Sequence, residues 1–202
     1  FFVLIPLVLI VGRYWKALAA TLTGVAVWAG LSVAAFGLEP WFGFIRGLPL
    51  ARGMILENQK DYWLSKMHTV FSAVRTVGGD MQTAYAVQTI VAIVAVLALI
   101  YIWNRRKLSL AIRGSSLCAA ILLASPYSFE YDLVLLAIPI ALLAKEGIEN
   151  GFLSFEKFFL FVLWVSPLFV RDYGGTYVLP LTPLLLIGLM ILCWRRMKQC
   201  SS

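Results

Sequence analysis

Long apolar blocks alternate with short polar stretches along the whole chain. An α-helix that crosses the roughly 30 Å hydrocarbon core of a bilayer needs about 20 residues, most of them apolar. We therefore predict an all-α fold, a polytopic transmembrane helical bundle with about six complete spans. Two of the blocks are short for a span and are expected to be half-buried, re-entrant or supported by neighbouring helices. The apolar blocks lie at 17–36, 81–103, 110–124, 131–144, 155–170 and 177–194.

A further apolar stretch at 1–11 is about half as long as a span requires. It carries neither the charged region nor the small-residue cleavage site of a signal peptide. We interpret it as the end of a truncated first span. Residues 1–202 are then expected to form a single transmembrane domain, the C-terminal part of a larger protein.

Composition supports a membrane location. Apolar residues make up 61% of the 202 residues and charged residues 13%, whereas a soluble domain averages roughly 45–50% apolar residues. The formal net charge is +7, but the basic residues gather at the ends of apolar blocks. This placement is typical of topology signals, so no nucleic-acid partner is expected.

Counting Lys and Arg on alternate sides of the predicted spans gives an orientation, because cytoplasmic loops are richer in both. The poorer side holds Arg171 and the five basic residues of segment 37–79. We predict a multi-pass plasma (inner) membrane protein with a cytoplasmic C-terminus and with Trp15, Trp103 and Trp194 as interfacial anchors. The richer side holds 11 residues, namely Arg13, Lys16, Arg105, Arg106, Lys107, Arg113, Lys145, Lys157, Arg195, Arg196 and Lys198.

Segment 37–79 is too long for a simple connector and is predicted to be an extracytoplasmic loop with interfacial helices. Apolar residues at helical spacing predict a second helix in it, which Ser65 could cap and Gly78 and Gly79 would end. That spacing involves Met67, Val70, Phe71 and Val74. The first helix would share Trp41, Phe42, Phe44, Ile45 and Leu48 on one face.

The other face of the second helix would bring together His68, Ser72 and Arg75, at spacings of i, i+4 and i+7. With Lys66 nearby, this stripe could bind a phosphate headgroup, because Arg and Lys are the usual partners of phosphate. The alternative is a solvated face, or one that binds anionic lipid without specificity. His68, the single histidine, is equally compatible with a structural hydrogen-bonding role.

A second polar group lies at 125–132, between two short apolar blocks. Pro126 interrupts the helix there and leaves two tyrosines and two carboxylates near the bilayer edge, namely Tyr127, Tyr131, Glu130 and Asp132. Acidic side chains at membrane depth mark candidate functional sites, whereas at the water interface they are ordinary loop residues. Both interpretations remain open on the residues alone.

No phosphate-binding loop, dinucleotide fingerprint, zinc motif or Ser/His/Asp signature occurs in the sequence. The three cysteines, Cys118, Cys193 and Cys200, have no spacing that indicates a disulfide framework or a metal site. We therefore expect no cofactor and no metal.

Three runs carry a family resemblance: GRYWKALAATLTGVAVWAGLSVAAFGLEPWFGFIRGLP at 12–49, KMHTVFSAVRTVGG at 66–79 and LLASPYSFEYDLVLLAIPIALL at 122–143. They resemble bacterial glycosyltransferase family 87, which comprises polytopic membrane enzymes of the GT-C class. In order, they extend over nearly the whole chain. The resemblance implies a GT-C-like bundle corresponding to the C-terminal half of such an enzyme.

The resemblance also implies an activity: inverting transfer of a hexose, often mannose, from a polyprenyl-phosphate sugar donor to a glycan or glycolipid acceptor on the outer face. The general base would be an acidic residue on an upstream outer loop, so this chain alone is expected to lack it. Lys66 and Arg75 would neutralise the leaving phosphate, while Tyr127 and Asp132 would order the sugar or its loop. The full substrate-binding set is Lys66, His68, Ser72, Arg75, Tyr127, Tyr131 and Asp132.

Two other classes of protein fit the same residues. A polyprenol or lipid transporter would use similar grooves and basic headgroup contacts without chemistry. A non-catalytic membrane scaffold would need nothing beyond the apolar content. Sugar transfer in vitro separates the enzyme from both.

Overall fold

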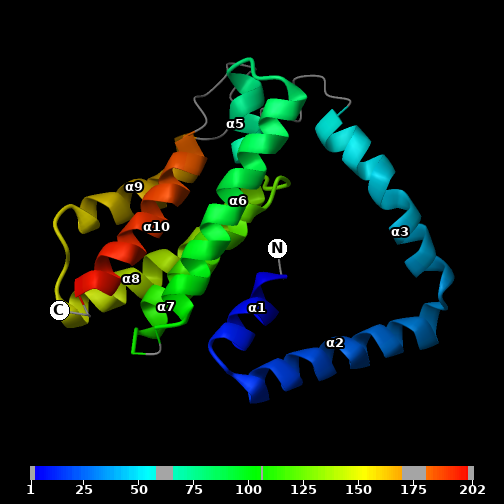
Figure 1. Cartoon of the computed structure of the whole chain (residues 1–202), viewed down its shortest axis with the longest axis horizontal. Helices are drawn as coiled ribbons and strands as arrows, with labels where there is room; N and C mark the ends of the chain where they lie inside the picture. Colours follow the sequence, from blue (N-terminus) through cyan, green and yellow to red (C-terminus); the bar gives the residue numbers. More distant parts are fainter. Residues whose placement is uncertain (1–2, 58–65, 106, 170–180, 200–202) are drawn as a thin grey trace.

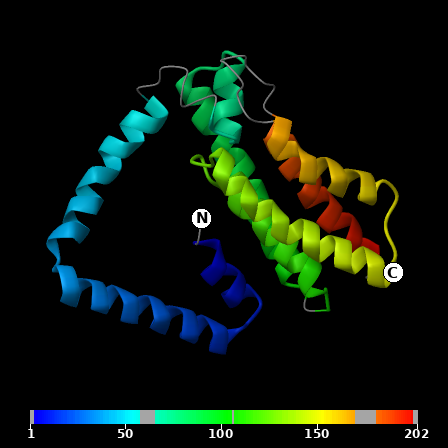
Figure 2. The same cartoon turned by 180° about the vertical axis from the view of Figure 1, so that it is seen from behind.

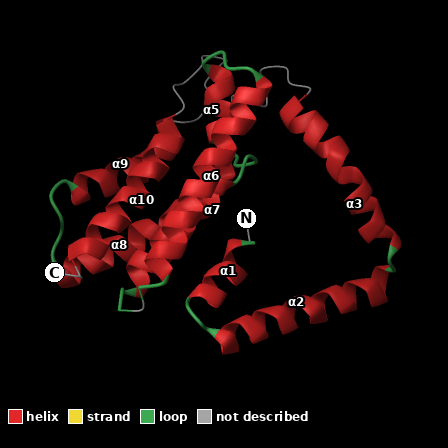
Figure 3. Ribbon diagram, in the orientation of Figure 1, coloured by secondary structure: helices red, strands yellow, loops and turns green. Residues whose placement is uncertain are grey.

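The computed structural model describes residues 3–57, 66–105, 107–169 and 181–199. Within these ranges the chain is helical and contains no strand, which confirms the predicted all-α class (Figure 3). The elements are α1 (Leu4–Val11), α2 (Trp15–Phe36), α3 (Glu39–Arg52), a π-helical turn η1 (Gly53–Glu57), α5 (Val70–Thr76), α6 (Met81–Trp103), α7 (Leu110–Ala124), a 3₁₀ segment η2 (Glu130–Leu136), α8 (Ala137–Asn150), α9 (Glu156–Phe169) and α10 (Leu181–Gln199).

Helix α7 lies at the centre of a bundle and packs against α6, α8 and α10 (Figures 1 and 2). Small buried residues line it, including Ser115, Ser116 and Ala119, and they allow neighbouring helices to approach closely. At Gly114, an added Cβ would lie 3.0 Å from the side chain of Leu142 on α8. A 15-residue helix that is short for a span is thus supported on several sides by its neighbours.

Two of the described helices, α2 and α6, are long and apolar enough to cross a membrane. Helix α6 begins where the sequence predicts, because the Asp80 side chain accepts a hydrogen bond of 2.7 Å from the Thr83 amide. Helices α7, α8, α9 and α10 have 15, 14, 14 and 19 residues. The structure therefore supports two candidate spans by length and composition, and the predicted count of six is not established.

Helices α2 and α3 extend away from the bundle and form two sides of an open triangle (Figure 1). No residue of either helix is buried. Helix α1 packs against α6 and α7 and connects this arm to the bundle. The first predicted interfacial helix is present as α3, and Trp41, Phe42 and Phe44 are among its exposed apolar residues.

The block at 131–144 is not one helix. It begins as the 3₁₀ segment η2, and α8 starts only at Ala137. Pro139 falls in the first turn of α8, where a backbone N–H has no partner within the helix and its loss costs little. Helix α10 continues past the predicted end at Trp194 to Gln199, and residues 177–180 of that block lie outside the described residues.

Two arginines that the sequence analysis counted as loop cations are buried. Arg113 on α7 is 9% exposed, donates to the Tyr14 hydroxyl at 2.6 Å and lies over the rings of Tyr14 and Trp103. Arg196 on α10 is 3% exposed and donates to both carboxylate oxygens of Glu156 at 2.6 Å. Trp103, predicted to be an interfacial anchor, is also buried, and its indole N–H donates to the Arg113 carbonyl. The basic end of the bundle therefore has internal packing as well as surface charge.

Candidate functional site

The two polar segments singled out in the sequence meet at one end of the bundle. Met67 and Phe129 form an isolated antiparallel bridge, and the His68 amide donates to the Ser128 carbonyl at 2.8 Å. The first segment leads into α5, and the second follows α7 and leads into η2. Sequence analysis treated the segments separately, so their backbone pairing is a finding of the structure.

The predicted apolar pattern of this helix starts at Met67, but helix α5 begins three residues later, at Val70. The Thr69 hydroxyl accepts a hydrogen bond from the Ser72 amide at 3.0 Å, and the Ser72 hydroxyl accepts one from the Thr69 amide at 3.1 Å. This reciprocal pair fixes Thr69 as the N-cap. Ser65, the predicted cap, lies outside the described residues. The predicted end is confirmed, with Gly78 at φ +90°.

The predicted cationic stripe on one face of this helix is wrong. His68 lies before the helix, in the bridge, and is only 7% exposed. Ser72 is 1% exposed and its hydroxyl donates to the Met67 carbonyl at 2.7 Å, so it has a structural role at the helix start. Arg75 is half-buried and donates to the Gly79 carbonyl at 2.9 Å. Lys66, half-buried, precedes the bridge.

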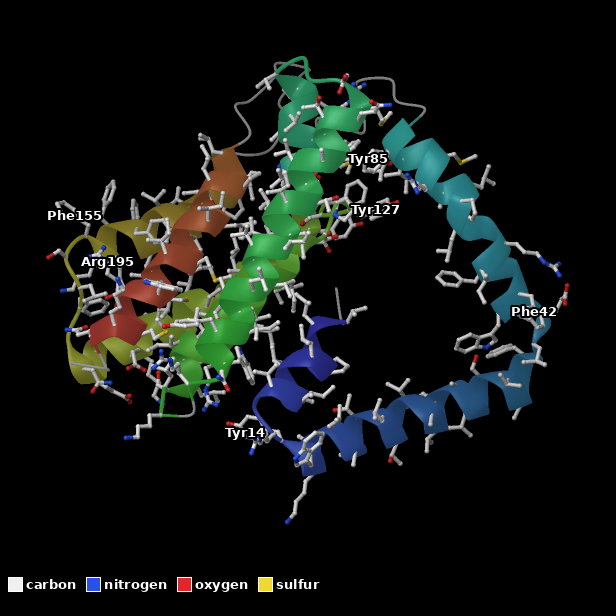
Figure 4. All side chains as sticks on the ribbon, in the orientation of Figure 1. Tyr14, Phe42, Tyr85, Tyr127, Phe155 and Arg195 are labelled. Atoms are coloured by element: carbon white, nitrogen blue, oxygen red, sulfur yellow. The ribbon has the colours of Figure 1, made fainter. Side chains whose placement is uncertain are left out.

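A small apolar cluster packs against this segment. Phe71 is fully buried in it, and its ring centroid lies 4.8 Å from that of Tyr85 on α6. The Arg52 guanidinium on α3 approaches the same tyrosine, with its carbon 5.1 Å from the ring centroid and its Nε 3.3 Å from the hydroxyl. Tyr85 and Tyr127 both pack on this cluster, on the side that faces α3 (Figure 4). The buried members are Leu56, Met67, Phe71 and Ala84.

Gln88 of α6 joins the parts of the site, and the sequence analysis missed it. Its Oε1 accepts from the Phe71 amide at 3.0 Å, and its Nε2 donates to the Leu123 carbonyl at 2.9 Å. The Phe71 amide lies in the first turn of α5 and the Leu123 carbonyl in the last turn of α7, so neither group has a partner within its own helix. A sequence signal was available, because an amide inside a predicted apolar block is costly unless its hydrogen bonds are satisfied.

The loop at 125–132 is held by its own side chains. Asp132 accepts a hydrogen bond of 2.8 Å from the Phe129 amide at the start of η2, and Ser125 accepts one of 3.1 Å from the Tyr127 amide. Tyr131 is 69% exposed and stacks on Phe129 with ring centroids 5.6 Å apart. Asp132 therefore orders the loop, and most of the Tyr131 side chain is exposed.

His68 and Ser128 each present a buried polar atom at the bridge. Within the described part of the chain, neither His68 Nε2 nor Ser128 Oγ has a hydrogen-bond partner. Burial lowers the pKa of His68 from 6.5 to about 4, because the charged imidazolium is poorly solvated there. The imidazole is therefore neutral at physiological pH. Among the described residues no group of three or more His, Cys, Asp or Glu side chains is placed to hold a metal ion.

These features define a class of protein: a helical protein with apolar, span-length helices that fits a membrane location, and with a polar cluster at one end of its bundle. The sequence model of glycosyltransferase family 87 matches residues 2–126, more than half of the chain. The chain belongs to this family. The matched stretch contains the 66–75 segment and ends at Pro126, before Tyr127, Tyr131 and Asp132. No curated protein and no solved structure matches the chain.

Proposed function

We propose that this glycosyltransferase transfers a hexose, with mannose as the expected sugar, from a polyprenyl-phosphate sugar to a glycan or glycolipid acceptor on the outer face of the plasma membrane. The observation that carries the proposal is the meeting of segments 66–75 and 125–132 at one end of an apolar bundle. A polyprenyl-linked substrate has the matching form, with a long apolar chain and a phosphate-linked sugar at its end. The basic opposite end of the bundle is then cytoplasmic.

In this proposal Lys66 and Arg75 bind the phosphate of the donor. Negative charge builds up on the polyprenyl phosphate as the glycosidic bond breaks, and fixed cations stabilise it. Both side chains are half-buried, so the local dielectric is below that of water and their charges act more strongly. Tyr127 and Asp132 order the loop against which the donor binds, which agrees with the hydrogen bond that Asp132 accepts from the Phe129 amide.

The experiment measures transfer of labelled mannose from polyprenyl-phosphate mannose in membrane vesicles that contain the intact gene product. Lys66→Ala and Arg75→Ala should each raise the donor KM about 10- to 100-fold, since a hydrogen bond to a charged group contributes roughly 1.5–3 kcal/mol. Arg75→Lys should recover part of the loss. Lys107→Ala, an exposed cation that the proposal places at the cytoplasmic end, is the matched control.

Unchanged donor kinetics in both alanine variants would remove the phosphate-binding role. Absence of transfer from every polyprenyl-phosphate hexose tested, with the protein folded in the vesicles, would reject the donor class. Movement of the labelled lipid across the vesicle membrane without sugar transfer would identify a transporter instead.

A further inference from the structure

The bridge at Met67 and Phe129 sets the direction of the side chains next to it. Antiparallel pairing places His68 opposite Ser128, and residues that lie opposite each other direct their side chains to the same face. Met67 and Phe129 are their immediate neighbours and both pack into the apolar cluster. Successive side chains alternate between the two faces. His68 and Ser128 therefore share the face that is turned away from this cluster.

Both side chains on that face are buried, and each has one polar atom that is unpaired within the described residues. His68 is 7% exposed and Ser128 is 0% exposed, and in the described ranges His68 Nε2 and Ser128 Oγ have no partner. Leaving a buried polar group unpaired costs about 1–3 kcal/mol. Native proteins seldom keep such groups unless water or a ligand satisfies them. Two adjacent unpaired groups, brought together by segments sixty residues apart (128 − 68 = 60), indicate a place built for a polar ligand.

The chemistry of the two groups restricts the ligand. Burial keeps the imidazole neutral, so it offers one donor and one acceptor nitrogen. A serine hydroxyl also both donates and accepts. A neutral donor and acceptor pair suits ligand hydroxyl groups, which need both roles at one atom. A phosphate offers acceptors and a negative charge, and is better bound by a cation.

We propose that His68 and Ser128 together bind hydroxyl groups of a hexose ring. The inference rests on the proposed function and extends it, because it separates recognition of the sugar from binding of the phosphate. Opposite residues in a bridge have Cβ atoms about 4.5–5.5 Å apart. The two side chains can therefore hold neighbouring hydroxyls of one ring. The hexose is either the sugar carried by the donor or the sugar that forms the acceptor.

Two further buried hydroxyls, which are unpaired among the described residues, lie on bundle helices and not in the bridge. Ser115 Oγ on α7 and Thr182 Oγ1 on α10 are also buried without a partner in the described residues. Ser115 lies within α7 and Thr182 within α10, and neither residue is part of the Met67–Phe129 bridge. Ser115→Ala is therefore a suitable control, since it removes a buried, unpaired hydroxyl outside the site.

The test combines variants with deoxygenated sugars, using the intact gene product in membrane vesicles. Wild type, Ser128→Ala, His68→Phe and Ser115→Ala are assayed with polyprenyl-phosphate mannose and with donors and acceptors that lack one hydroxyl at a time. Ser128→Ala and His68→Phe should lower kcat/KM for the complete sugars about 10-fold or more, the effect of losing roughly 1.4 kcal/mol of hydrogen bonding. His68→Gln, a neutral side chain that also donates and accepts, should recover part of the activity.

The decisive result is a loss of discrimination. Wild type and Ser115→Ala should reject one particular deoxy sugar. Ser128→Ala should use that deoxy sugar and the complete sugar equally well. The position of the sugar, on donor or acceptor, identifies which hexose the pair binds. Equal discrimination in wild type and both site variants would overturn the inference and leave a trapped water as the partner of the two groups. If wild type transfers no sugar at all, the proposed function fails and the inference falls with it.

Discussion

Replacing Gln88 by leucine tests how the polar end of the bundle is held together. Gln88 is 4% exposed, and its amide bonds the Phe71 N–H of α5 and the Leu123 C=O of α7. Leucine has a similar volume and can form neither hydrogen bond. Both backbone groups lie at helix ends, so neither finds a replacement within its own helix.

The expected cost follows from these two orphaned groups. A buried donor or acceptor left unpaired costs about 1–3 kcal/mol, and greater burial of the apolar leucine offsets part of the total. We expect a net loss of roughly 2–4 kcal/mol. For a chain of this size, each kcal/mol lowers Tm by about 2–4 °C, so Gln88→Leu should lower the apparent Tm by roughly 5–15 °C.

The assay is thermal unfolding of the purified protein in detergent, followed by tryptophan fluorescence. Gln82→Leu is the matched control, because Gln82 belongs to the same helix and is exposed. Hydrogen exchange provides a second, local measurement, since the Phe71 amide should exchange faster in Gln88→Leu and at the wild-type rate in the control. A Tm shift no larger than that of Gln82→Leu would refute the reasoning and indicate that water replaces the lost amide.

Two further predictions concern buried charge. Glu156→Gln leaves the Arg196 guanidinium buried without its carboxylate and should lower the free energy of unfolding by about 3–5 kcal/mol. Glu149→Gln is the control, because Glu149 belongs to an exposed pair with Lys145 at 3.7 Å. It should change that free energy by less than about 0.5 kcal/mol in the same unfolding assay. The folded pKa of His68 is lowered to about 4, so its contribution to stability is complete above pH 6.5 and is lost as the pH falls towards 4, by about 3 kcal/mol in total. Apparent Tm of wild type should therefore fall more steeply than that of His68→Gln over this range, and parallel curves would contradict the assignment.

The helices that the sequence predicts well carry their own start or end signals. Helix α6 begins after Asp80, whose side chain caps it, and α7 ends at Ala124, close to Pro126. Both ends depend on local hydrogen bonding or local sterics that a short window of sequence contains. Helix α5 is shorter than its apolar period indicates, because the reciprocal bonds of Thr69 and Ser72 fix its start at Val70. Apolar periodicity identifies a buried face, and the cap decides where the helix begins.

The site is harder to predict, because its main contact joins residues far apart in the sequence. His68 pairs with Ser128 through a backbone hydrogen bond. Almost any residue can form such a bond, so no side-chain pattern in the sequence predicts it. The sequence singles out the two segments by their polar content. It does not show that they touch, nor that His68 and Ser72 are buried while Tyr131 is exposed.

Burial also gives the neutral and the charged residues of the proposed site different roles. Holding His68 as a cation at its buried position costs about 3 kcal/mol at neutral pH relative to water, so a phosphate there would need a second source of positive charge. Lys66 and Arg75 are only half-buried, and lysine and arginine are the usual partners of phosphate. A donor that is bound by its phosphate at these cations and by its sugar at the neutral pair would then have one orientation, with its anomeric carbon between the two. That arrangement predicts a salt dependence for only one of the two variants, since the effect of Arg75→Ala on donor KM should shrink as ionic strength rises and the effect of Ser128→Ala should not change.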